Sequence, residues 1–126
     1  AFPWRGFLKG GAVLAFGSDA PVEDPNPYIS LAAAETREDP AGDPPGGFLP
    51  DQKLTRTEAL RAYTLGNAKA LGRQDMGRIQ KGAVADLLWL SAPILALSPA
   101  ELRSLRPGRL WVSGAEVDLP SVAAAH

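Results

Sequence analysis

The stretch AVLAFGSD, residues 12–19, decides how the rest of this chain is interpreted. Ala12 to Phe16 are apolar without any alternation, and such a run predicts a strand covered on both faces, as in a parallel sheet flanked by helices. The run ends on Gly17-Ser18-Asp19, and a proline follows two residues later. Asp19 is therefore either an ordinary turn residue or a chemical group presented at the carboxyl end of a buried strand.

Composition limits the possible partners. The chain has 126 residues, of which 45% are hydrophobic and 21% charged, and these values are typical of one soluble globular domain. Its 13 basic and 14 acidic residues give a net charge of −1, which favours a small neutral partner over nucleic acid or an anionic membrane. No apolar stretch is long enough to cross a membrane. The absence of cysteine and of a recognisable targeting segment predicts a cytoplasmic location.

The number of histidines restricts the possible chemistry of this chain more than any other residue count. The chain has one, His126, and it is the last residue, in a sequence typical of a frayed end. Chemistry that needs an imidazole base or a cluster of histidine ligands therefore has to obtain them from outside this chain.

Sequence patterns predict four helices, over residues 3–9, 28–37, 55–71 and 98–105. The third has the strongest signals, because Thr55 and Glu58 form a capping box and Gly72 stands at the expected stop. The fourth begins with a second capping box, formed by Ser98 and Glu101. A proline-rich and glycine-rich loop, residues 39–53, precedes it and is either a lid over a site or a disordered connection.

Beyond Gly72 the sequence pattern changes from one typical of helices to one typical of strands and turns. A short extended piece is expected at residues 77–79, a strand at residues 85–90, and a hairpin over residues 109–117 with a type II′ turn at Gly114-Ala115. These strands are too few to close a core by themselves. The chain thus divides into an α/β part, residues 1–72, a β-rich part, residues 73–120, and a tail, residues 121–126.

Four phrases in this order resemble a known family. They are GSDAPVEDPNP (residues 17–27), LTRTEALRAYTLGNAKALG (54–72), MGRIQKGAVADLLWL (76–90) and RLWVSGAEV (109–117). Together they span nearly the whole chain, and they resemble the C-terminal part of metal-dependent amidohydrolases, specifically the amidohydrolase 3 group that includes N-substituted formamide deformylase-like enzymes.

The resemblance implies a fold. The chain would be an α/β fragment, the C-terminal portion of a (β/α)8 TIM barrel together with strands of a small β-sandwich. Residues 12–19 would be the eighth barrel strand, residues 1–72 the last βα portion of the barrel, and residues 73–120 part of the sandwich. Active sites of such barrels lie at the carboxyl ends of the strands, which is where Asp19 falls.

The resemblance also implies a role for Asp19. It matches the family's strand-eight aspartate, which accepts a proton from metal-bound water and passes one to the leaving nitrogen, and which is also a possible metal ligand in the intact enzyme. The expected cofactor of that enzyme is a divalent metal, zinc, and the expected partners are a small amide-type substrate and further copies of the same protein. The family's histidines and its lysine or carboxylate bridge have no match here, so the chain resembles the last quarter of such an enzyme, inactive and without metal when alone.

Two other functions stay open. One is a non-catalytic assembly or interaction module, and the other is a deaminase of the same superfamily that acts on a cyclic amidine. Other polar residues are expected to be structural: Asn67 and Thr64 pack with the main helix, and Asp86 makes turn hydrogen bonds.

Overall fold

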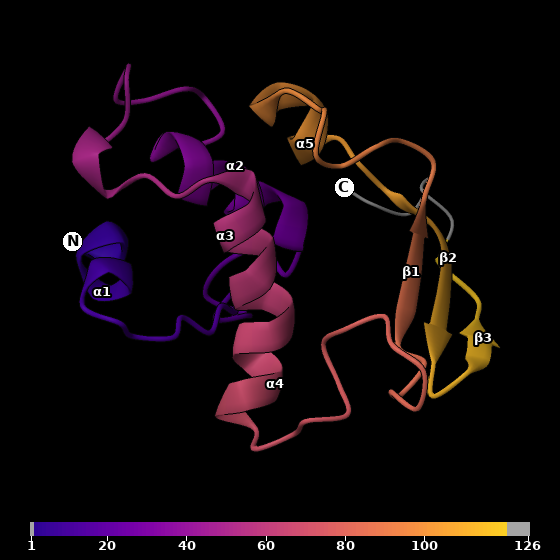
Figure 1. Ribbon diagram of the computed structural model, residues 1–126. Coiled ribbons are helices and arrows are strands. Elements are labelled where there is room, and N and C mark those ends of the chain that lie inside the picture. Colours follow the sequence, from indigo (N-terminus) through magenta and orange to yellow (C-terminus); the bar gives the residue numbers. More distant parts are fainter. Residues whose placement is uncertain (1, 121–126) are drawn as a thin grey trace.

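The computed structural model describes residues 2–120 (Figure 1). Helices are the regular elements of the first part of the chain, and a small antiparallel sheet lies beyond the longest helix. In chain order the elements are α1 (Trp4–Lys9), α2 (Pro27–Thr36), the 3-10 turn η1 (Pro50–Gln52), α3 (Arg56–Arg61), the π-helical turn η2 (Ala62–Gly66), α4 (Asn67–Ala70), β1 (Leu87–Leu90), α5 (Pro99–Arg103), β2 (Pro107–Val112) and β3 (Ala115–Val117).

Both expected capping boxes are confirmed. The Thr55 hydroxyl accepts the amide of Glu58 (3.2 Å) while the Glu58 carboxylate accepts the amide of Thr55 (2.8 Å). Ser98 and Glu101 make the same reciprocal pair at the start of α5, at 3.3 and 2.7 Å. Each pair satisfies two amides that have no partner inside the helix. Local sequence therefore sets where these two helices begin.

The long helix follows the expectation for residues 55–71, with one difference. It runs through α3, η2 and α4, and five of its residues, Ala62–Gly66, form a π-helical turn instead of an α-helical one. A π turn holds one residue more per hydrogen-bonded ring than an α turn, and no sequence pattern predicted it here. The three segments form one continuous helix (Figure 1), in which the π turn is wider than its α-helical neighbours.

The expected strand at residues 12–19 is not formed. This segment has irregular backbone, and its amide of Phe16 donates to the Ala62 carbonyl of the long helix (3.2 Å) instead of to another strand. A strand exists only where a neighbouring strand receives its hydrogen bonds, and the sheet of the described chain contains β1, β2 and β3 alone. Residues 77–79, also expected to be extended, lie in a loop.

The sheet has the order β1-β2-β3, with both pairs antiparallel. Leu88 pairs with Leu110, which pairs with Val117, so these three aliphatic side chains share one face. Trp111 pairs with Glu116 on the opposite face, where Arg109 binds the Glu116 carboxylate at 2.7 Å. One face is therefore aliphatic and the other amphipathic.

The observed hairpin turn differs in type from the expected one. Its central residues are Ser113 (φ 51°) and Gly114 (φ 82°), and two positive φ values define a type I′ turn instead of type II′ at Gly114-Ala115. The Asp86 carboxylate accepts the Ser113 amide (2.8 Å) and thereby supports this conformation. Asp86 has the structural role expected of it.

The core lies between α2, the start of the long helix and α5. Alanines and leucines dominate it, so helix backbones approach closely: its buried members are Tyr28, Leu31, Ala32, Ala34, Leu54, Ala59, Leu102 and Leu105. No helix within residues 2–120 has both the length and the apolar character that a membrane span requires.

One charged side chain is buried beside this core. The Arg56 guanidinium, at the start of α3, donates to the Glu35 carboxylate of α2 at 2.6 and 2.9 Å. It also donates to the carbonyls of Leu97 (2.9 Å) and Ile94, in the segment that leads to α5. A buried charge is tolerated only when its hydrogen bonds are satisfied, and here they join three segments distant in sequence.

Replacing Arg56 by methionine keeps much of the apolar stem but leaves two carbonyls and a carboxylate without their donor. We expect the free energy of unfolding to fall by about 3 kcal/mol. Urea unfolding followed by circular dichroism measures this, with Arg61→Met, an exposed position on the same helix, as a control expected to stay within about 0.5 kcal/mol of wild type. Equal stability of Arg56→Met and wild type would show that apolar packing alone joins the three segments.

Candidate functional site

Asp19 lies at the end of the irregular segment, with its side chain exposed. Its backbone has a left-handed conformation (φ 57°), which aspartate adopts more readily than most residues. Its carbonyl accepts the amide of Val22 (2.9 Å), so the backbone forms a turn. The structure therefore shows the turn, and it leaves the carboxylate accessible to a small molecule.

The segment that leads to Asp19 is held against the long helix. The side-chain amide of Asn67 donates to the Phe16 carbonyl (2.9 Å) and to the Tyr63 carbonyl (3.1 Å). The Phe16 ring packs against Trp4 (centroids 5.2 Å apart) and edge-on against Tyr63 (5.7 Å). Asn67 is thus a hydrogen-bonded packing residue, as expected, and Thr64 donates to the Leu60 carbonyl of its own helix (2.8 Å).

The residues beside Asp19 do not complete a metal site. Within residues 2–120, no three side chains of histidine, cysteine, aspartate or glutamate lie close enough together to hold a metal ion. The nearby Asp24 accepts the amide of Asn26 (2.8 Å) and so serves the turn before α2. The described residues therefore do not fit a divalent ion by themselves, and His126 lies outside them.

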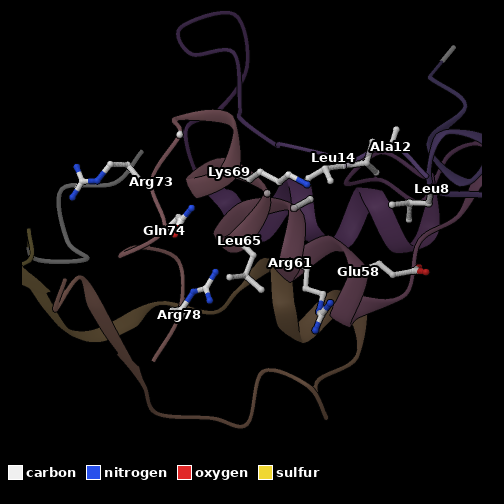
Figure 2. Close-up of a pocket in the computed structure, with 14 residues that line it drawn as sticks. Leu8, Ala12, Leu14, Glu58, Arg61, Leu65, Lys69, Arg73, Gln74 and Arg78 are labelled. Carbon is white, nitrogen blue, oxygen red and sulfur yellow. The ribbon is translucent and has the colours of Figure 1, made fainter. Parts of the chain in front are cut away.

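A separate pocket of about 540 Å³ lies between the long helix, residues 8–14 and the loop that follows α4 (Figure 2). Its aliphatic residues include Leu8, Leu14 and Leu65, and its basic residues are Arg61, Lys69, Arg73 and Arg78. Asp19 does not line this pocket, so Asp19 and the pocket are two separate candidate sites. The sequence signal for this pocket was the spacing of four between Arg61, Leu65 and Lys69, which places them near one another on a helix.

Glu58 is the acidic residue of this pocket, and it is engaged by Arg5 of α1. The two carboxylate oxygens accept the guanidinium at 2.6 and 2.7 Å. These bonds lower the pKa of Glu58 to about 2, against partial burial, which raises it, and the Thr55 amide contributes further in the lowering direction. The pair fastens α1 to the start of the long helix.

Comparison with known proteins extends these observations. The model of the amidohydrolase family matches residues 1–118, nearly the whole chain. The chain belongs to the amidohydrolase family. Within this family, the amidohydrolase chain is 37% identical to N-substituted formamide deformylase of Arthrobacter pascens over 114 residues, which cover 90% of the chain and 20% of the deformylase.

Two further relatives agree with this placement. Imidazolonepropionase of Streptomyces griseus is 43% identical over 72 residues, which cover 53% of the amidohydrolase chain and 17% of that protein. Among solved structures, a mutant of atrazine chlorohydrolase TrzN from Arthrobacter aurescens, complexed with zinc and atraton, superposes with a TM-score of 0.63 and 30% identity, covering 90% of the chain and 27% of TrzN. The amidohydrolase chain therefore spans about a sixth to about a quarter of the length of these three proteins.

Removing the charge of Glu58 tests the contact between α1 and α3. The pKa of Glu58 falls from 4.5 to about 2 in the folded protein, so its contribution to stability is present above pH 4.5 and is lost as the pH falls toward 2. We expect Glu58→Gln to cost about 1 kcal/mol at pH 7, a value reduced for solvent screening, and the difference from wild type to shrink in acid. Unfolding by urea at a series of pH values measures it.

Glu101→Gln is the matched control, because Glu101 closes the other capping box and has no arginine bound to it among the described residues. A Glu58→Gln effect that is equal at pH 7 and pH 2 would contradict the role given to Arg5.

Proposed function

We propose that this chain is the C-terminal portion of a metal-dependent hydrolase that acts on carbon–nitrogen bonds other than peptide bonds, of the amide or formamide type. The observation that carries the proposal is the 37% identity to N-substituted formamide deformylase over 90% of the chain. In this proposal residues 1–72 complete a (β/α)8 barrel, with residues 12–19 as its eighth strand, and residues 73–120 belong to a β-sandwich.

Three features of the structure support the proposal that this chain is part of a longer polypeptide. Residues 12–16 are apolar yet have no strand of the described chain beside them, and on the aliphatic face of the sheet Leu88 is 46% and Val117 40% exposed. In addition, the Tyr63 hydroxyl is buried and has no hydrogen-bond partner among the described residues. Buried polar groups and aliphatic sheet faces normally have partners, which neighbouring segments of a longer polypeptide would supply.

Asp19 is the proposed proton carrier. As the oxygen of a water molecule attacks the carbonyl carbon, the Asp19 carboxylate takes one proton from that water, and as the carbon–nitrogen bond breaks it gives the proton to the leaving nitrogen. The carboxylate is thereby restored. The exposed position of Asp19 supports this role because substrate and water have access to it.

The proposed metal, zinc, would be held by residues outside this chain. The related TrzN structure is complexed with zinc, whereas the described residues supply no cluster of ligands. Asp19 offers one carboxylate toward such a site.

Asp19→Asn in a full-length protein that contains this chain tests the assignment. The amide keeps the shape of the carboxylate but cannot carry a proton, so we expect turnover of an N-substituted formamide to fall by about a hundredfold or more, with metal content largely unchanged. Asp24→Asn is the control, because the Asp24 carboxylate only accepts a backbone amide. Turnover by Asp19→Asn within about tenfold of wild type, with elemental analysis showing normal metal, would reject the assignment.

A non-catalytic assembly module is the alternative that one observation favours, the lack of a metal-ligand cluster in residues 2–120. The coding sequence upstream discriminates the two, because the hydrolase proposal requires a histidine-bearing barrel there. The deaminase alternative is tested by offering the same full-length protein a cyclic amidine.

The 126-residue chain by itself provides a further test. Because residues 12–16 and the aliphatic sheet face lack partners within residues 2–120, we expect it to self-associate or to be partly ordered, to bind no zinc and to show no hydrolase activity. Size-exclusion chromatography with light scattering and a zinc titration measure these properties. A cooperatively folding monomer that binds zinc tightly would show that the fragment proposal is wrong.

A further inference from the structure

The π-helical turn lies directly against the segment that carries Asp19. Hydrogen bonding in a π turn runs from residue i to i+5, so the turn is wider than its α-helical neighbours, and such turns occur frequently at functional sites. At the first residue of this turn, the Ala62 carbonyl accepts the Phe16 amide (3.2 Å). The helix thus gives a backbone acceptor to a segment outside it.

Gly66, the last residue of the turn, permits the closest approach. A Cβ atom at this position would lie 1.9 Å from the Leu14 carbonyl oxygen and 3.0 Å from its carbonyl carbon. Real Cβ atoms do not approach other heavy atoms this closely, so any larger residue has to push the segment away from the helix. Glycine is therefore required here for its size.

Asn67 follows Gly66 and completes the contact. Its side-chain nitrogen donates to the Phe16 carbonyl (2.9 Å) and to the Tyr63 carbonyl (3.1 Å), which uses both of its hydrogens. Together with the bond to Ala62, both backbone groups of Phe16 are hydrogen bonded to the helix. The segment is thus held at Phe16, three residues before Asp19.

We propose that Asn67 is a positioning residue for Asp19, acting through the backbone of Phe16, and that Gly66 makes this contact possible; the inference rests on the proposed role of Asp19. The Asp19 side chain is exposed, so the path of the backbone that leads to it determines where its carboxylate lies. Proton transfer requires heavy atoms within about 3 Å of one another, and a displacement of about 1 Å can lower a rate about a hundredfold.

Two substitutions in the full-length protein separate positioning from packing. Asn67→Asp keeps the shape but directs a carboxylate, which cannot donate, at two carbonyl oxygens, and Asn67→Ala removes the group. For both we expect kcat to fall by about tenfold or more while KM stays within about threefold, because Asn67 does not touch the substrate.

Amide hydrogen exchange gives a readout that does not depend on activity or metal. In both variants we expect the Phe16 amide to exchange about tenfold faster, because loss of the Asn67 bond to the Phe16 carbonyl loosens the segment and with it the bond of the Phe16 amide to Ala62. Thr64→Val is the matched control on the same helix, since the Thr64 hydroxyl bonds only to the Leu60 carbonyl. We expect its kcat and exchange to stay within about twofold of wild type.

Wild-type kcat and exchange in Asn67→Asp would overturn the inference, whether or not Asn67→Ala folds, since the shape is retained and only the donor is lost. If Asp19→Asn is inactive while both Asn67 variants have normal kcat, the positioning role alone is wrong. If Asp19→Asn is active, the proposed function of Asp19 and this inference both fail.

Discussion

The buried guanidinium of Arg56 links the helices of this chain to one another. Arg56 binds a carboxylate on α2 and two carbonyls before α5, so the two helices that flank the core are both tied to the first residue of α3. A charge in this position stabilises the structure only while all these partners are in place, because an unpaired buried charge is very costly. The small alanine-rich core therefore depends on a polar contact to fix the relative positions of its helices.

Features encoded by neighbouring residues were predictable from the sequence. The capping boxes at Thr55 and Ser98, the helices and the structural role of Asp86 follow from patterns a few residues long, and the structure confirms them. The exposed turn at Asp19 was also among the stated possibilities.

Features that depend on distant contacts were not predictable. The partners of Arg56 lie 21 to 41 residues away in sequence, so no local sequence pattern predicts these contacts. The strand expected at residues 12–19 needed a neighbouring strand that the described chain does not contain. The turn type at Ser113 is supported by an acceptor 27 residues earlier. Apolarity identified the right segments, whereas the hydrogen-bond partners decided their conformation.

The π-helical turn has a consequence for register along the long helix. Successive residues of an α-helix are rotated by about 100°, so one additional residue in a single turn changes which side chains after it share a face with those before it. With the turn present, Lys69 lines the same pocket as Arg61, and Asn67 reaches the Phe16 carbonyl. Deleting one residue between Ala62 and Gly66 would let this turn return to α-helical winding with α4 in nearly the same orientation relative to α3, whereas deleting one residue from an α-helical turn would rotate everything after it by about 100°. The widened turn thus takes up one residue without moving the side chains of α4 away from their partners.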